Sequence, residues 1–495
     1  MQNKIFTIKK ILSERKNNLV NISFRVKDSL LYVISNFLSQ FIILLALPLY
    51  WQKLTLRDYG VIAVVEIISL FLSNILGLSL EHAISRFYFE WDEEEKKNKT
   101  GALWIANWIF CLVFGFLSLF FLELSSNFLF PDIPFYPFLF LGSLYTILYS
   151  LPNFVLATIR VAGEPYLFSF YRIFSVVLQI GITIYLVVYR NQGLYGYFVG
   201  SIVTGLLLIV VCVFIMIKFA SLNIDLHFTK KALKFCLPII PSNFVVTLSS
   251  LFDRFFIQHT LPLEYLGIYS VSLKFSNVIY SLHTALKFSF VPYMVSSISK
   301  SVEDGKKSIA QNSFYYIIPI FITALAISLF IKPFILLSGQ TEYHQVVEYV
   351  PFLVGITMLS TLNVYFASGL YLAKKTKLMW IAPFAQFILF GILSYYLIKP
   401  FGLYGIIGAK FVGTLFFLFM SIYLSNKFFS INYLWRNLFW LVFVFIAFLF
   451  VAQLVLTGKQ YLDMFILIFL MVGFIIMAFS ITGIIKLPKT KLYSK

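Results

Sequence analysis

Long apolar segments separated by short polar segments follow one another along most of this chain. An α-helix needs about 20 consecutive apolar residues to cross the hydrocarbon core of a bilayer, and these segments have that length. The apolar residues are continuous rather than alternating, which is typical of membrane helices and not of barrel strands. The pattern predicts about fourteen spans, at 29–52, 60–80, 101–123, 137–159, 166–189, 194–217, 236–258, 267–291, 313–336, 349–371, 378–398, 402–425, 437–456 and 462–484.

The sequence also repeats itself over a long distance. Ser35-Asn36-Phe37 recurs as Ser242-Asn243-Phe244, an offset of 207 residues (242 − 35). Farther along, the Gly-Leu-Tyr-Gly of 193–196 recurs at 402–405, an offset of 209 (402 − 193). The first offset relates five further pairs of positions: Leu54 and Leu261, Leu56 and Leu263, Gly60 and Gly267, Val64 and Val271, and Ser69 and Ser276.

Each copy of the repeat holds six predicted spans. Because six is even, both copies enter the membrane from the same side and are parallel repeats. Duplicated apolar halves are typical of transporters that move two similar bundles about a central path. We therefore predict an all-α polytopic membrane protein of two parallel six-helix repeats plus a C-terminal helix pair. Its parts are a cytoplasmic basic segment (1–28), a first bundle (29–219), a cytoplasmic linker (220–235), a second bundle (236–428) and the helix pair with a basic tail (429–495).

Composition and charge support this class. Hydrophobic residues make up 60% of the 495 residues and charged residues 12%, too few charges to cover the surface of a soluble protein. The net charge of +18 is compatible with nucleic-acid binding, but its distribution argues for a topology instead. Lys and Arg concentrate in the tails and in alternate loops, and the positive-inside rule then places both termini in the cytoplasm. We expect no nucleic-acid partner.

Motifs of catalysis and of cofactor binding are absent from the sequence. It has no phosphate-binding Gly-Lys-Ser or Gly-Lys-Thr loop and no dinucleotide fingerprint after a strand. The five His are scattered without metal-ligand spacing, and the three Cys lie in or beside predicted spans. We therefore expect neither an enzyme nor a protein with a metal or cofactor.

Ionisable residues inside the predicted spans are the candidate functional residues, since each costs roughly 2.5–3.5 kcal/mol on membrane-insertion scales. For Lys287, near the cytoplasmic end of its span, the sequence favours extension of the side chain to the interface. The other candidates are Glu66, Arg172, Asp253, Arg254, Lys274 and Lys410.

All of these except Arg172 lie near the outer ends of their spans, and two interpretations of them remain open. A Glu66–Lys274 or Asp253–Lys274 pair facing across a cavity is one, and a structural ion pair that ties the two halves together is the other. Because cations outnumber acids, a cavity lined by them would favour an anionic substrate such as a phosphate. Glu66 and Asp253 have the alternative role of coupling transport to H⁺ or Na⁺.

Several motifs, taken in order, resemble one known family. They are Leu-Pro-Ile-Ile-Pro-Ser-Asn at 237–243, Asp-Arg-Phe-Phe-Ile at 253–257 and Leu-Gly-Ile-Tyr-Ser at 266–270, with a matching first-half turn at 54–61 and a basic-aromatic helix end at 86–89. Together they resemble the polysaccharide and O-antigen (Wzx-type) flippases of the multidrug/oligosaccharidyl-lipid/polysaccharide (MOP) exporter superfamily.

The resemblance implies a function that the residues alone do not define. Such flippases move an undecaprenyl-pyrophosphate-linked oligosaccharide, the repeat unit of O-antigen or another surface polysaccharide, across a bacterial inner membrane by alternating access. The sugar passes through a cationic cavity while the lipid tail stays in the bilayer, and a polymerase and a chain-length regulator are expected partners. The resemblance assigns substrate contacts to Arg254 and Lys274, with Arg86, Arg172 and Lys410 as further cavity residues. Asp253 would orient Arg254 or couple an ion.

Three other functions compete with this one. A multidrug or small-solute antiporter of the same superfamily predicts twelve spans and a more acidic cavity. A membrane O-antigen polymerase predicts a long extracytoplasmic loop and no six-helix duplication. A purely structural exporter subunit has no need of charges inside the membrane.

Overall fold

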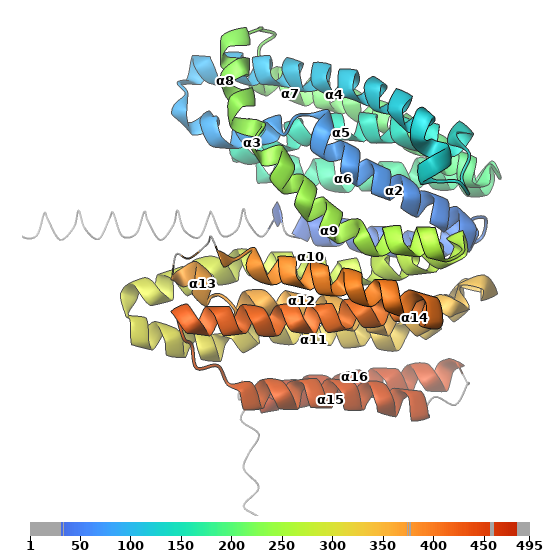
Figure 1. Ribbon diagram of the computed structural model, residues 1–495, viewed down its shortest axis with the longest axis vertical. Helices are drawn as coiled ribbons and strands as arrows, with labels where there is room; N and C mark the ends of the chain where they lie inside the picture. Colours follow the sequence, from blue (N-terminus) through green and yellow to red (C-terminus); the bar gives the residue numbers. More distant parts are fainter. Residues whose placement is uncertain (1–30, 33, 374, 376–377, 456–459, 483–495) are drawn as a thin grey trace, which may run out of the picture.

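The computed structural model describes residues 31–482 except 33, 374, 376–377 and 456–459, so the predicted basic N-terminal segment and most of the basic C-terminal tail lie outside it. The described residues form helices and turns and no strand, as the sequence predicts. Figure 1 shows two groups of helices that meet along a shared junction, with a separate helix pair packed against the second group.

The first group follows a helix at Ile34–Tyr50. It contains a short 3₁₀ turn, η1 (Tyr88–Glu90), and two π-helical turns, η2 (Phe135–Leu139) and η3 (Tyr185–Tyr189), beside its α-helices. These are α2 (Leu56–Leu76), α3 (Leu80–Phe87), α4 (Glu93–Leu129), α5 (Phe140–Val161), α6 (Pro165–Ile184), α7 (Gly193–Phe219) and α8 (Leu226–Cys236).

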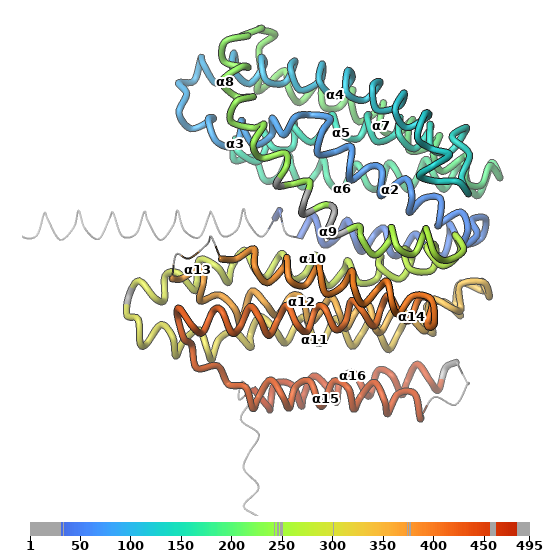
Figure 2. Tube along the Cα trace, in the orientation of Figure 1, coloured from blue at the N-terminus to red at the C-terminus, as the bar shows by residue number. Residues whose placement is uncertain are grey.

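The second group begins with α9, which runs from the first group to the second (Figure 2). It includes the 3₁₀ turn η4 (Thr341–Tyr343) and ends with the separate pair α15 and α16. Its α-helices are α9 (Ile239–Thr260), α10 (Leu263–Lys300), α11 (Val302–Ser338), α12 (His344–Phe366), α13 (Gly369–Leu372), α14 (Ile381–Phe428), α15 (Trp435–Val455) and α16 (Gln460–Ile481).

Of the described helices, 10 are long and apolar enough to cross a membrane. The helix Ile34–Tyr50 is shorter, and α9 and α10, which carry charged residues, are not among the 10. Helix α14 covers the two spans predicted at 378–398 and 402–425. The backbone of Gly402 is not helical (φ 54°, ψ −131°) and separates the two parts. The protein is therefore a multi-pass all-α membrane protein, and the count of about fourteen spans stays a prediction.

Local chemistry explains where two elements differ from the predicted boundaries. Thr55 begins α2 with a capping box: its hydroxyl accepts from the Asp58 N–H, and the Asp58 carboxylate accepts from the Thr55 N–H at 2.8 Å. The predicted linker 220–235 contains α8, which Asp225 caps by accepting from the Phe228 N–H. One face of α8 is buried against α3 and α4, so most of the linker is a packed helix.

The two groups are joined at the end of the molecule where α2 and α10 begin, which we call the closed end. The Trp51 ring stacks on Tyr343 of η4 with 4.6 Å between centroids, and the Tyr343 hydroxyl donates to the Leu54 carbonyl. The Leu56 N–H donates to the Glu342 carboxylate at 2.8 Å. Toward the opposite end the first group has an apolar core of its own, formed by α3 to α8. Among the described helices, α2 makes the main contacts between the groups, most extensively with α10 and to a lesser extent with α9.

Two repeat-related glycines let α2 and α10 approach closely at the closed end. A Cβ atom on Gly60 would lie 2.4 Å from the Leu263 carbonyl oxygen, and one on Gly267 would lie 1.9 Å from the Leu56 carbonyl oxygen. Neither separation is possible for real atoms, so only glycine permits this backbone contact. We call it the glycine crossing.

Gly267→Ala is expected to lower the melting temperature of the detergent-solubilised protein, because the added methyl group must push α10 away from α2. Overpacking of this kind costs about 1–3 kcal/mol. Gly355→Ala in α12 is the matched control, since a Cβ there meets nothing within 4 Å and alanine favours a helix. Equal melting temperatures for Gly267→Ala and the wild type, measured by size-exclusion chromatography after heating, would show that the crossing does not stabilise the junction.

Candidate functional site

Three ionisable side chains from three helices meet at the junction. Glu66 of α2 accepts from Arg254 Nη1 of α9 at 3.3 Å and from Lys274 Nζ of α10 at 3.2 Å. Arg254 and Lys274 are largely buried, while Glu66 is about one-third exposed. One carboxylate of the first repeat therefore binds two cations of the second.

A second set of charged and polar groups lies beside the first. Asp253 of α9 pairs with Lys410 Nζ of α14 at 2.5 Å and accepts from the Tyr269 hydroxyl of α10. Lys410 also donates to the Tyr269 oxygen at 2.9 Å, and the other Asp253 oxygen accepts from the Arg254 N–H at 2.8 Å. The Asp253 side chain is only 4% exposed, so its charge is compensated almost entirely by these partners.

We refer to the two sets together as the junction cluster: Glu66, Asp253, Arg254, Lys274, Lys410 and Tyr269. Its formal charge is +1, from three cations and two carboxylates. The Arg254 Nε is buried and has no hydrogen-bond partner among the described residues. The cluster thus keeps a surplus of positive charge and donor capacity inside a membrane protein, where an unpaired polar group is costly.

The structure brings together five of the seven sequence-predicted residues. Of the two pairs considered from the sequence, Glu66–Lys274 is present, and Asp253 pairs with Lys410 rather than with Lys274. Whether the Glu66–Lys274 pair faces a cavity or only ties the halves together stays a prediction. Tyr269 was not predicted as a site residue, although the Gly-Ile-Tyr-Ser motif at 267–270 contains it.

Arg86 and Arg172 lie apart from the junction cluster in the hydrogen-bond and ion-pair network of the described residues. Arg86 of α3 is exposed and pairs with Glu90 one helical turn away. Arg172 of α6 is partly buried, and its Nε has no partner among the described residues. A substrate-binding role for either residue stays a prediction.

Helices α2 and α9 meet along a line that we call the α2–α9 seam. The Arg254–Glu66 pair lies on the closed-end side of it. Phe71 then packs edge-on against Phe244, with 5.1 Å between ring centroids. Farther from the closed end, Asn74 Nδ2 donates to Thr247 Oγ1 at 2.9 Å. Among the described residues, an ion pair, an aromatic contact and a hydrogen bond thus join α2 to α9 along the seam.

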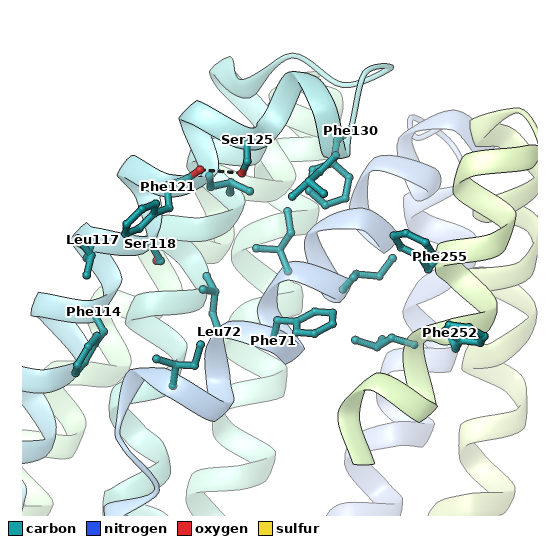
Figure 3. Close-up of a pocket in the computed structure, with 16 residues that line it drawn as sticks. Phe71, Leu72, Phe114, Leu117, Ser118, Phe121, Ser125, Phe130, Phe252 and Phe255 are labelled. Atoms are coloured by element: carbon teal, nitrogen blue, oxygen red, sulfur yellow. Dashed lines mark hydrogen bonds between the residues drawn. The ribbon is translucent and has the colours of Figure 1, made fainter. Parts of the chain in front are cut away.

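An apolar groove of about 580 Å³ lies between α4 and α9, with α2 as its floor (Figure 3). Its two polar side chains, Ser118 and Ser125, donate to carbonyls of their own helix, those of Gly115 and Phe121. The described lining of the groove therefore offers hydrocarbon and aromatic surface. Its lining comprises Ile67, Ile68, Phe71, Leu72, Ile75, Phe114, Leu117, Ser118, Phe121, Leu122, Ser125, Leu129, Phe130, Leu251, Phe252 and Phe255.

Within the described ranges, no group of three or more His, Cys, Asp or Glu side chains is arranged to hold a metal ion. In the junction cluster, an arginine and two lysines lie around two carboxylates.

Solved structures similar to this one are flippases and transporters. A lipid II flippase, MurJ, in an inward closed conformation has a TM-score of 0.62 at 16% identity, over 91% of this chain and 98% of that chain. The Vibrio cholerae MATE transporter VcmN has a TM-score of 0.54 at 15% identity, over 83% of this chain and 97% of that chain. An inward-facing multidrug resistance MATE family transporter of the MOP superfamily has a TM-score of 0.54 at 15% identity, over 78% of this chain and 94% of that chain.

At these identities the similarity establishes the fold, which is that of membrane transporters. No curated protein matches the chain. Residues 54–338 match the model of a family described as polysaccharide biosynthesis protein, which agrees with the resemblance found in the motifs. Because the match covers more than half of the 495 residues, this chain belongs to the polysaccharide biosynthesis protein family.

Proposed function

We propose that this protein is a flippase that moves an undecaprenyl-pyrophosphate-linked oligosaccharide, the repeat unit of O-antigen or another surface polysaccharide, across a bacterial inner membrane. The observation that carries the proposal is the junction cluster, where surplus positive charge links helices of both repeats. A pyrophosphate cannot cross hydrocarbon without partners, and Arg and Lys are the side chains that bind it best.

Exchange of partners would couple binding to movement. In the absence of substrate, Glu66 holds Arg254 and Lys274 and so ties α2 to α9 and α10. A pyrophosphate that binds these two cations competes with Glu66 and weakens the tie between the bundles. A ligand shifts a conformational equilibrium only by binding one state more tightly, and this competition supplies such a difference. The bundles then alternate between an inward-open and an outward-open arrangement.

A cation gradient would act on the same groups. Protonation of Glu66 or Asp253, or binding of Na⁺ to either carboxylate, would release the lysine or arginine that it holds. In this proposal the coupling ion is H⁺ or Na⁺, and the protein has no cofactor.

The remaining assignments belong to the same proposal. Both termini are cytoplasmic, and the closed end then faces the outside. Arg86 and Arg172, nearer the cytoplasmic side, would attract the pyrophosphate before it reaches Arg254, Lys274 and Lys410 in a cationic cavity between the halves. A polysaccharide polymerase and a chain-length regulator are the proposed protein partners.

The second candidate function is a multidrug or small-solute antiporter, which the fold shared with the two MATE transporters favours. The charge of the junction cluster argues against it for cationic drugs, because surplus positive charge repels them.

A deletion strain separates these functions. We expect deletion to abolish surface glycan and to leave undecaprenyl-linked repeat units on the cytoplasmic side, and wild-type protein to restore the glycan. Arg254→Ala is expected to reduce transport about 10- to 100-fold, because a hydrogen bond to a charged group is worth about 1.5–3 kcal/mol. The readouts are surface glycan and the side on which lipid-linked units accumulate.

Arg190→Ala, which removes an exposed arginine, is the matched control and should restore the glycan fully at equal membrane abundance. Surface glycan reduced to single repeat units would identify a polymerase. Normal glycan together with altered drug sensitivity would identify the antiporter.

A further inference from the structure

The apolar groove and the α2–α9 seam share a side chain. Phe71 is part of the groove floor and also packs against Phe244 across the seam. Phe252 and Phe255 of α9 form the opposite wall, so the seam runs along the groove (Figure 3). Separation of α2 from α9 along the seam would open the groove on the side of the seam.

The charged residues stand next to the groove residues in sequence but on other faces of the same helices. Glu66 precedes Ile67 on α2, and Arg254 precedes Phe255 on α9. Successive residues of an α-helix point in directions about 100° apart, since a turn takes 3.6 residues. The two helices therefore present hydrocarbon to the groove and charge toward each other and α10.

The described lining of the groove fits a hydrocarbon chain. The hydroxyls of Ser118 and Ser125 are engaged by their own helix, and the other described lining residues are apolar. Its volume of about 580 Å³ is in the range of roughly 300–1,000 Å³ that small-molecule sites occupy. A polar segment placed there would lose its hydrogen bonds to water without replacement.

We propose that the groove holds the hydrocarbon chain of the transported lipid while its pyrophosphate binds Arg254 and Lys274, and that the chain passes through the α2–α9 seam. This proposal rests on the proposed function and adds to it the position of the lipid's hydrocarbon chain. The occupant is an anionic lipid rather than a neutral one, because the positive surplus of the junction cluster borders the seam. The Arg254–Glu66 ion pair belongs to the seam, and it is the pair that a pyrophosphate would displace.

The test uses purified protein in liposomes and two substrates with the same pyrophosphate-linked sugar, one on an undecaprenyl chain and one on a two-isoprene chain. Ser118→Trp puts a large side chain into the groove. We expect it to slow transport of the undecaprenyl substrate at least tenfold and to leave the short-chain substrate unchanged. Leu124→Trp is the control, because Leu124 lies on α4, is exposed and does not line the groove.

Labelling of wild-type protein with a photoreactive undecaprenyl pyrophosphate gives a second measurement that needs no variant. We expect labels on α4 between 114 and 129 and on α9 between 251 and 255, and unlabelled undecaprenyl pyrophosphate should compete. Equal competition by a neutral phospholipid would mean that ordinary bilayer lipid occupies the groove and would overturn the proposal.

Failure of this inference differs from failure of the proposed function. Wild-type protein that moves neither substrate contradicts the flippase itself. If wild-type protein moves the undecaprenyl substrate and Ser118→Trp is equally active, the proposal that the groove holds the hydrocarbon chain is overturned, and the proposed flippase function is not.

Discussion

Asp253→Ala is expected to abolish transport and to destabilise the protein by about 3–5 kcal/mol, the usual cost of breaking a buried ion pair from one side. The substitution leaves the Lys410 ammonium without its carboxylate and removes the acceptor of the Tyr269 hydroxyl. It also removes the acceptor of the backbone N–H of Arg254, the arginine that we assign to the substrate. Transport in liposomes and thermal unfolding in detergent measure the two effects.

The charge-swapped variant Asp253→Lys with Lys410→Asp separates a structural role of this pair from a functional one. We expect the swap to recover much of the lost stability, because an ion pair between α9 and α14 is restored. Transport should stay low, because the carboxylate has moved away from Arg254. Full recovery of transport together with stability would mean that the pair only ties the helices together.

Cross-linking the α2–α9 seam is expected to arrest transport completely. In Asn74→Cys with Thr247→Cys, the two thiols replace side chains joined by a 2.9 Å hydrogen bond, so a short bifunctional thiol reagent can bridge them. The bridge would hold together helices that must separate when the bundles move apart. Transport before cross-linking, after it, and after release of a cleavable cross-linker is the measurement.

The control pair is Tyr149→Cys with Gln179→Cys, which replaces a 2.9 Å hydrogen bond between α5 and α6 of the same bundle. Its cross-linking should leave transport unchanged, because these helices move as one body. The native cysteines Cys111, Cys212 and Cys236 are buried and should react slowly. A cross-linked seam that still transports at the full rate would show that the seam stays shut during the cycle.

The apolar segments predicted the class of fold well, because the requirement to satisfy every backbone group in lipid leaves helices as the spanning structure. Element ends were harder to predict. Helix α4 begins at Glu93, well before the predicted span at 101, since Lys96–Glu93 and Lys99–Glu95 pairs support a polar helical extension. Helix α8 was missed because its three lysines obscure an apolar face formed by Phe228, Ala232 and Cys236.

The candidate site shows a similar division. The cost of charge in a membrane identified the five charged members of the junction cluster from sequence, but not Tyr269. The partner of Asp253 could not be found in this way, because no periodicity relates position 253 to position 410, and only the packing of α9 on α14 brings them together. The groove has no sequence signal either, since apolar residues that line it and apolar residues that face lipid have the same composition.

The glycine crossing bears on how such a chain arose. Leu56 contacts Gly267, and Gly60 contacts Leu263. At the 207-residue offset, Leu263 is the counterpart of Leu56 and Gly267 is the counterpart of Gly60, so the two contacts are exchanged by the repeat. That reciprocity defines the isologous interface of a two-fold symmetric homodimer. An ancestral half-length protein pairing with itself through this surface would need no new interface when two gene copies fused. In such a history the glycine crossing would be older than the fusion, and the charges that differ between the repeats, on α2, α9, α10 and α14, would have come after it.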